Sequence, residues 1–248
     1  IRLAIVTNVD DLDALAATYV DDHRRHPNGA PWVLLNMISS ADGAIAVDGL
    51  SGALGNDADL AVFKALRSIA DVVLVAAGTA RAEGYRAPQP SAEAMAERRR
   101  RGQAERPMIA VVTRSLRLEL DGELFADPTY RPVVVTVDDA PEDRRDALAE
   151  HAELVVAGTG DVDLGAAIAE LARRHGPVVL AEGGPTLNGQ LAAADLFDEL
   201  CLTTSPLVVG GSGPRIMHDG DDHDPRSFEI DRALTARGLL FTRYLRRR

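Results

Sequence analysis

The segment with the strongest chemical character is 178–187, which reads VVLAEGGPTL. Its β-branched apolar run predicts a buried strand, and Glu182, two glycines and Pro185 lead from that strand into a helix. Glycine lets the backbone approach a ligand closely, and proline suits a first helical turn because it has no N–H group to leave unpaired. The unpaired N–H groups of such a turn attract phosphate. The segment therefore predicts either a phosphate-binding turn or a tight turn without a ligand.

Small and polar residues recur at the carboxyl ends of four predicted strands. In open α/β sheets the ligand crevice forms outside those ends, so a long polar cofactor would be held there. The triplet at 113–115 combines two hydroxyl groups with a guanidinium group, which matches a phosphate monoester and favours NADP over NAD. Each strand end taken alone is more typical of an ordinary turn. The strand-end residues are Asn36, Ser39 and Asp42; Gly78 and Thr79; Thr113, Arg114 and Ser115; and Glu182, Gly183, Gly184, Pro185, Thr186 and Leu187.

Two carboxylates are candidates for catalysis. Asp42 follows a predicted buried strand in the sequence SSADG. It either stabilises a turn before Gly43, or it orients a substrate amine or supplies a proton during a reduction. Glu83, in GTARAEGYR, likewise has either a structural or a functional role, because a surface salt bridge would account for a glutamate there equally well.

Other types of site are weakly supported. The GTG sequence at 158–160 lacks the third glycine of a dinucleotide fingerprint, and no P-loop or nucleophile elbow occurs. The run HDGDDHD at 218–224 is more typical of an acidic surface loop than of a metal site, so we predict no metal. The single cysteine, Cys201, excludes an intrachain disulfide and is expected to be a small core residue.

Composition narrows the class of partner. The 248 residues carry a formal net charge of −11, which argues against nucleic-acid binding, so local donors must hold an anionic ligand. Hydrophobic residues make up 46% of the chain, enough for a sizeable core. No apolar run is long enough for a signal peptide or a membrane span. We expect a cytoplasmic protein that binds a small molecule and not a membrane.

Alternating strand and helix patterns predict an α/β fold with a mixed, mostly parallel sheet, helices on both faces and an antiparallel finish. The predicted helix at 57–70 places Leu60, Phe63, Leu66, Ile69 and Ala70 on one face. The basic run 98–101 in another predicted helix indicates a solvated helix, a lid or an anion-binding patch. Strands are predicted at 32–39, 71–77, 108–113, 132–137, 153–157, 178–181, 198–204 and 238–246, and helices at 10–21, 57–70, 91–105, 141–150 and 162–175.

Four stretches resemble, in order, the reductase domain of bifunctional riboflavin-biosynthesis deaminase-reductases. They are NMISSADG at 36–43, VVLVAAGTARAEGY at 72–85, AEGGPTL at 181–187 and DELCLTTSPLVVGG at 198–211. The set looks most similar to the stand-alone, reductase-like branch of actinobacteria. The resemblance implies a dihydrofolate-reductase-like domain over 31–248 with an N-terminal extension over 1–30, and it implies a homodimer.

The resemblance also implies NADPH-dependent reduction of the ribosyl group of 5-amino-6-(5-phosphoribosylamino)uracil to the ribityl product. We therefore expect Asp42 and Glu83 to be catalytic. By similarity, the residues expected to contact the cofactor are Ile38, Thr79, Glu83, Arg114 and the loop 184–190. Those expected to contact the substrate are Ser51, Arg67 and Glu182, with Arg67 binding its phosphate. The strand-end residues Asn36 and Asp42 are further candidates for substrate contact.

The sequence departs from the family pattern on the substrate side. Asn36 stands where the family commonly has lysine, and the family's Asp-Asp-Pro-x-Leu-Thr-x-Arg stretch is replaced by residues 82–88. The zinc signature of the deaminase partner is absent, because it needs more than one cysteine. Two alternatives stay open: a reductase of a dihydrofolate-like pteridine, and an NADP-binding protein without catalysis.

Overall fold

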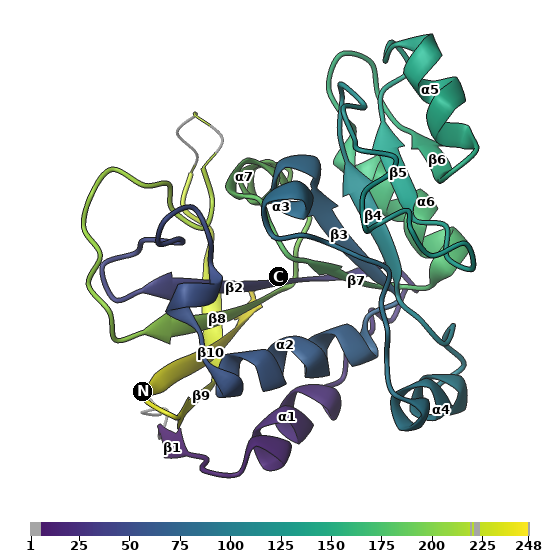
Figure 1. Cartoon of the computed structure of the whole chain (residues 1–248). Helices are drawn as coiled ribbons and strands as arrows, with labels where there is room; N and C mark the ends of the chain where they lie inside the picture. The colour runs from purple at the N-terminus through teal and green to yellow at the C-terminus, as the bar shows by residue number, and fades with distance from the viewer. Residues whose placement is uncertain (1–5, 219, 221–223, 248) are drawn as a thin grey trace. The chain divides into compact units, whose positions relative to one another are not determined.

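The structure is a computed structural model that describes residues 6–218, 220 and 224–247 (Figure 1). The chain forms two compact units. Unit 1 comprises Ile1–Arg24, Val33–Ile69 and Ala181–Arg248, and unit 2 comprises Arg25–Trp32 and Ala70–Leu180. The mixed, mostly parallel α/β fold expected from the sequence is confirmed, and each unit holds part of the predicted site.

In unit 1 the strands follow the order β1-β9-β10-β8-β2. The pairs β1–β9 and β2–β8 are parallel, whereas β10 pairs antiparallel with both β8 and β9, which confirms the antiparallel finish. The elements are β1 (Thr7–Asn8), α1 (Leu12–Val20), β2 (Trp32–Ser40), η1 (Gly52–Leu54), α2 (Asp57–Ile69), α7 (Pro185–Ala193), β8 (Glu199–Ser205), β9 (Phe228–Ala236) and β10 (Leu239–Arg246).

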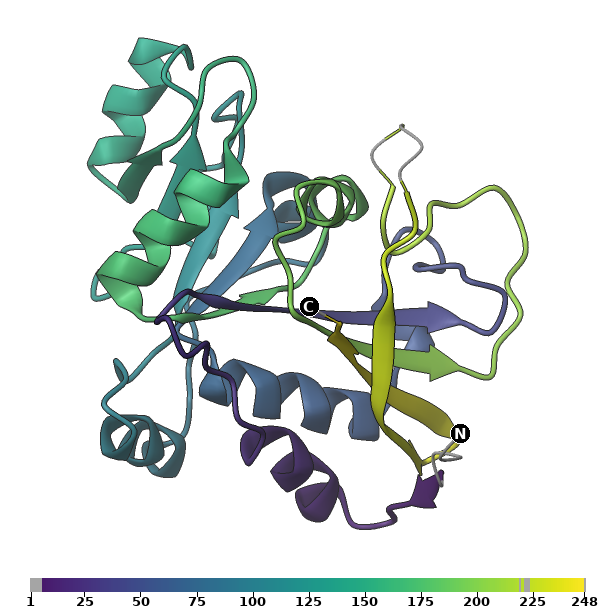
Figure 2. The same ribbon diagram turned by 180° about the vertical axis from the view of Figure 1, so that it is seen from behind.

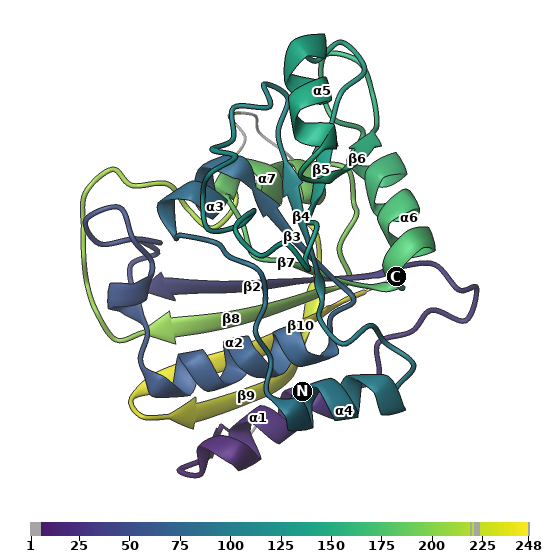
Figure 3. The same cartoon turned by 45° about the vertical axis from the view of Figure 1, so that its right-hand side comes forward.

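Helix α2 supplies much of the core of unit 1, and Figure 3 shows it lying along β8 and β10. Its buried stripe consists of Ala58, Val62, Ala65, Leu66 and Ile69. The predicted apolar face was wrong at Leu60, whose side chain is 48% exposed, because the true stripe starts at Ala58 and leaves position 60 toward solvent. Helix α1 packs against α2, with Leu15 and Tyr19 buried.

A buried ionic cluster fastens the segment after α1 to the sheet of unit 1. Arg24 binds both carboxylate oxygens of Glu199 at 2.9 and 2.7 Å, and Arg243 Nε donates to the same carboxylate at 2.8 Å. Burial by itself would raise the pKa of Glu199, but hydrogen bonds and attraction from Arg243 and Arg24 outweigh it and lower the pKa to about 2. Asp22 extends the cluster by binding Arg232 at 2.7 Å. Glu199 is therefore a carboxylate that two arginines keep charged in the core.

In unit 2 the strands follow the order β7-β3-β4-β5-β6, and the pairs β3–β4, β4–β5 and β5–β6 are parallel. Figure 2 shows α6 lying across these strands. The first four residues of β3 are fully buried, as expected for a strand covered on both faces. The elements are β3 (Val72–Ala76), α3 (Ala77–Ala82), α4 (Ala92–Arg100), β4 (Met108–Val112), β5 (Val133–Thr136), α5 (Glu142–Ala149), β6 (Glu153–Val156), α6 (Leu164–His175) and β7 (Val178–Ala181).

The basic run of α4 is held by local partners. Arg98 is buried and donates to the carbonyl oxygens of Ala70 at 2.8 Å and Ala104 at 2.7 Å. Arg99 pairs with Glu105, and Arg100 and Arg101 pair with Glu97. The solvated-helix interpretation suits the exposed arginines but is wrong for Arg98, which ties α4 to the chain before β3.

Gly158 gives a stability prediction with an internal control. Its φ is +88°, and a Cβ atom there would lie 2.3 Å from the carbonyl oxygen of Asp161. Gly160 has a φ of +73° but no atom within 4 Å of its Cβ position. We expect Gly158→Ala to lower the free energy of unfolding by about 2–4 kcal/mol and Gly160→Ala by about 1 kcal/mol, because only the first combines a clash with backbone strain. Urea denaturation of both variants tests this, and equal losses would contradict it.

Candidate functional site

The predicted site residues fall into two groups. The ends of β2 and β7, with Arg67 on α2 and Ser51 before η1, belong to unit 1. The ends of β3 and β4, with Glu83, belong to unit 2. Within each group the structure brings several of the predicted residues into direct contact.

Arg67 and Glu182 form a two-bond ion pair, although 115 positions separate them. Arg67 Nε donates to Oε1 of Glu182 at 2.8 Å, and Nη2 donates to Oε2 at 2.6 Å. The Glu182 side chain is 3% exposed and the Arg67 side chain 24%. The Arg67 guanidinium also lies 4.2 Å from the ring centre of Phe63, one helical turn earlier. The pair fixes a partly exposed guanidinium group in one orientation.

The glycine turn after β7 has the predicted strand–turn–helix form. The Gly183–Gly184 peptide bond is cis, Gly184 is the N-cap of α7 and Pro185 begins the helix. In the part of the chain that the structure describes no side chain caps α7, and Thr186 in its first turn is exposed. Two bonds join α7 to the loop after β8: Asn188 Nδ2 donates to the carbonyl oxygen of Ile216 at 2.9 Å, and the backbone N–H of His218 donates to Pro185 at 2.9 Å.

Asp42 joins the loop after β2 to the loop after β8. Its carboxylate accepts hydrogen bonds from the backbone N–H groups of Val209 at 3.1 Å and Gly210 at 2.6 Å, and from the Ser40 hydroxyl at 2.5 Å. The bonds from Ser40, Gly210 and Val209 lower the pKa of Asp42 to about 2. Asp42 is therefore a carboxylate at neutral pH, and its bonds hold the two loops together.

Replacing Asp42 tests its role in holding the loop. In Asp42→Asn the amide NH2 group faces a backbone donor, so we expect the bond from Gly210 to be lost. Hydrogen exchange at the Val209 and Gly210 amides should become about tenfold faster, which corresponds to about 1.4 kcal/mol of local stability. Asp48→Asn, in the same loop before η1, is the control and should leave these amides unchanged. Equal exchange in Asp42→Asn and the wild-type protein would contradict the role.

The remaining unit 1 candidates lie on β2 and before η1. Asn36 and Ile38 are half-buried on β2 and pair in register with Cys201 and Thr203 of β8, whereas Ser39 is buried. Ser51 is half-buried at the N-cap of η1. Cys201 is buried, and burial raises the pKa of its thiol well above the usual value, in agreement with a core role.

Asp59, in the first turn of α2, is a half-buried acid outside the predicted set of site residues. Its carboxylate accepts a hydrogen bond from the hydroxyl of Thr203, which is 1% exposed on β8. Burial raises the pKa of Asp59, and the Thr203 bond only partly opposes the rise. An acidic residue in a first helical turn is common near a helix dipole, so the sequence carries no signal that singles out this one.

In unit 2 the residues after β3 form a short helix and not a simple turn. Gly78 and Thr79 lie inside α3, and the backbone N–H of Glu83, its C-cap, donates to Thr79 at 2.9 Å. The sequence AGTARA is short and carries no apolar periodicity, so α3 escaped prediction. Glu83 is exposed at the end of α3.

The triplet after β4 is held by its neighbours. Thr113 Oγ1 accepts from the N–H of Leu116 at 3.1 Å, and the carbonyl oxygen of Ser115 accepts from Arg144 Nη1 at 2.7 Å. Arg114 pairs with Asp161 at 2.6 Å, with both side chains mostly exposed. The three predicted residues therefore lie in an ordered turn whose backbone α5 supports through Arg144.

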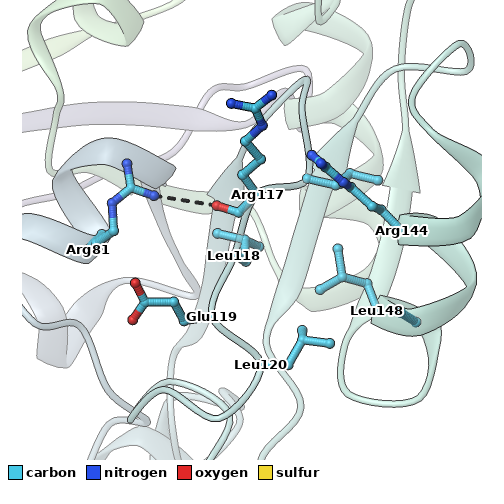
Figure 4. A pocket seen from close by; sticks show the side chains of 9 residues that line it. Arg81, Arg117, Leu118, Glu119, Leu120, Arg144 and Leu148 are labelled. Carbon is cyan, nitrogen blue, oxygen red and sulfur yellow. Dashed lines mark hydrogen bonds between the residues drawn. The ribbon is translucent and has the colours of Figure 1, made fainter.

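A pocket of about 480 Å³ adjoins this turn (Figure 4). In Figure 4 the guanidinium groups of Arg81, Arg117 and Arg144 lie apart from one another in the upper part of the view, and the side chains of Leu120 and Leu148 lie below them. Arg81 donates to the carbonyl oxygen of Arg117 at 3.4 Å. Glu119 is the acidic residue in the lining, so the lining has an excess of positive charge. A second pocket of about 280 Å³ shares Arg81, Leu118 and Glu119. The sequence prediction did not include these pocket arginines.

Two further observations concern only residues that the structure describes. Among them no group of three or more His, Cys, Asp and Glu side chains is arranged to hold a metal ion. The predicted acidic loop at 218–224 lies partly outside them, at 219 and 221–223. None of the described helices is both long and apolar enough to cross a membrane.

Residues 31–235 match the model of the RibD C-terminal domain family. The chain is 29% identical over 192 residues to the 2,5-diamino-6-ribosylamino-4(3H)-pyrimidinone 5′-phosphate reductase of Archaeoglobus fulgidus, covering 77% of this chain and 87% of that relative. It is 30% identical over 222 residues to the reductase of the same name from Methanothermobacter thermautotrophicus, covering 86% of this chain and 97% of that relative. A solved pyrimidine reductase-like protein from Corynebacterium diphtheriae shares 28% identity with a TM-score of 0.81, covering 88% of this chain and 92% of that one. This similarity confirms the fold expected from the motifs.

Proposed function

Because the chain belongs to the RibD C-terminal domain family, a family of reductase domains, we propose that it reduces a ribosylaminopyrimidine 5′-phosphate to the ribityl product with NADPH. The observation that carries the proposal is the Arg67–Glu182 pair, which holds a partly exposed guanidinium group in a fixed orientation. A guanidinium group so held suits the 5′-phosphate of the substrate. The substrates named for the two archaeal relatives carry such a phosphate.

In this proposal the residues after β2 and β7 hold other groups of the site in place. Glu182 keeps Arg67 aimed at the phosphate, and Asp42 fixes the loop after β8 beside the end of β2. Asn36, Ile38, Ser39 and Ser51 are the remaining candidates for contact with the pyrimidine, the sugar or the cofactor. Orientation of a small substrate by several fixed groups contributes to rate by lowering the entropic barrier.

The residues of unit 2 fit the phosphate of NADP. The pocket lining contains Arg81, Arg117 and Arg144 and one acidic residue, Glu119, and hydrogen bonds to backbone carbonyl oxygens orient Arg81 and Arg144. We therefore assign the 2′-phosphate to these arginines and to Thr113, Arg114 and Ser115. Gly78, Thr79 and Glu83, together with the residues at the α7 N-terminus, stay candidates for the rest of the cofactor. NADPH, when bound, supplies the hydride.

Side-by-side assays test the proposal. NADPH oxidation is measured with 5-amino-6-(5-phosphoribosylamino)uracil, with 2,5-diamino-6-ribosylamino-4(3H)-pyrimidinone 5′-phosphate and with dihydrofolate. We expect turnover with a ribosylaminopyrimidine, and mass spectrometry of the product should show the gain of two hydrogens. Turnover with dihydrofolate alone would favour the pteridine alternative. Saturable NADPH binding without oxidation of any substrate would favour a non-catalytic protein.

We also propose a homodimer in the cytoplasm. An exposed apolar run follows β8, with Leu207, Val208 and Val209 at 44%, 79% and 40% exposure, and a second copy of the chain would cover it. Sedimentation equilibrium of the purified protein tests the dimer, and a monomer at micromolar concentration would contradict it.

A further inference from the structure

Arg114 differs from the other arginines to which the 2′-phosphate is assigned above, because its partner is charged. Arg81 and Arg144 donate to backbone carbonyl oxygens, which carry no net charge. Arg114 Nη1 instead donates to Oδ1 of Asp161 at 2.6 Å, across 47 positions of the sequence. The side chains of Arg114 and Asp161 are 64% and 72% exposed, so a ligand can reach both. A carboxylate therefore already binds the guanidinium group that follows β4.

The loop that carries Asp161 connects β6 to α6, and two acids after β5 hold it in place. The hydroxyl of Thr159 donates to Asp138 Oδ2 at 2.8 Å, and the backbone N–H of Gly160 donates to Asp139 Oδ1 at 2.9 Å. The N–H of Asp161 itself donates to the carbonyl oxygen of Thr159 at 2.8 Å. These bonds fix the backbone on both sides of the loop, so the Asp161 carboxylate is kept within reach of the end of β4.

A fixed carboxylate at this position opposes the binding of a phosphate to Arg114. Guanidinium groups bind carboxylates and phosphates through the same N–H donors, so the two anions compete. A phosphate that binds Arg114 must displace Asp161 or lie beside its like charge. Displacement is feasible, because ion pairs between exposed side chains are weak. The contact therefore lowers the affinity of Arg114 for a phosphate without preventing its binding.

We propose that Asp161 is a specificity-determining residue for the cofactor, which competes with the 2′-phosphate for Arg114 and thereby weakens the preference for NADPH over NADH. The proposal rests on the proposed function, which assigns the 2′-phosphate to the turn after β4. NADH has a hydroxyl group in place of this phosphate, so its binding does not require the ion pair to open. Asp161 acts on the affinity for the cofactor and takes no part in the reduction.

Calorimetric titration with NADP⁺ and with NAD⁺, which differ only in the 2′-phosphate, tests the proposal without turnover. We expect Asp161→Asn to bind NADP⁺ about threefold to fivefold more tightly than the wild-type protein does, with NAD⁺ affinity unchanged within about twofold. The gain should shrink at high salt, because both side chains are exposed. Asp143→Asn is the matched control: it removes an exposed carboxylate from the first turn of α5 and should leave both affinities unchanged.

A double-variant cycle shows whether Asp161 acts through Arg114. Arg114→Ala should weaken the binding of NADP⁺ but not of NAD⁺, and Asp161→Asn added to it should change NADP⁺ affinity by less than about twofold. An equal gain with and without Arg114 would overturn the proposal, because the effect would then be one of net charge. Unchanged or weaker NADP⁺ binding in Asp161→Asn would also overturn it and leave the proposed function intact. A wild-type protein that binds neither nucleotide would overturn both.

Discussion

Replacing Glu199 with glutamine is expected to lower the free energy of unfolding by about 3–5 kcal/mol, because two buried guanidinium groups lose their shared counter-charge. Arg24 and Arg243 both bind this carboxylate, and the Glu199 side chain is fully buried. A loss of this size is a large part of the about 5–15 kcal/mol by which domains are usually stable. Urea denaturation at pH 7 measures it.

The same variant changes the response to acid. The pKa of Glu199 is lowered from 4.5 to about 2, so its contribution to stability is complete above pH 4.5 and is lost as pH falls toward 2. Glu199→Gln should lack this part of the acid dependence. Glu170→Gln is the matched control, because Glu170 also binds two arginines, Arg173 and Arg174, but on the surface of α6. Its effect on stability should be small. Equal effects of the two substitutions would show that burial of the cluster contributes nothing.

Replacing Arg67 with alanine is expected to reduce kcat/KM for the ribosylaminopyrimidine by about a hundredfold, or about 2.7 kcal/mol, mainly through KM. The reason is the loss of a charge-assisted contact to the 5′-phosphate. The KM for NADPH should stay unchanged. Steady-state kinetics with each substrate varied in turn separates the two.

Two controls separate binding from folding. Arg67→Ala removes the guanidinium group that binds both carboxylate oxygens of the buried Glu182, and the double variant Arg67→Ala, Glu182→Gln also removes the carboxylate charge, so it should recover stability but not substrate affinity. Lys64→Ala removes an exposed cation from the same helix and should behave as wild type. A single variant with wild-type KM for the pyrimidine would exclude Arg67 as the phosphate ligand.

Local sequence patterns predicted the elements that carry the site. The apolar runs of β2, β3 and β7 and the Gly-Gly-Pro start of α7 are signals within a few residues, so their type and order follow from burial and backbone preference. Strand β9 was missed because it reads FEIDRALTA, with charged residues and three consecutive exposed positions in place of a clean alternation. Tertiary pairing with β10 and β1 makes it a strand.

Contacts between distant residues could not be predicted in the same way. The family motifs pointed to Arg67 and Glu182 separately, but only the fold shows that they bind each other. Arg81, Arg117 and Arg144 line one pocket although they come from three separate segments of the sequence. Hydrophobic periodicity does not predict contacts between such distant residues, because these contacts depend on how the elements pack. The roles of these residues in binding and catalysis stay predictions.

The ionic cluster around Glu199 has a practical consequence for trimming the protein. The family match begins at residue 31, so a shortened protein designed from this match would lack residues 1–30. Such a version would retain the carboxylate on β8 and Arg243 on β10 but discard Arg24, the second counter-charge. It would also uncover the side of α2 on which α1 packs. A boundary drawn from similarity alone would therefore cut through the interior of unit 1.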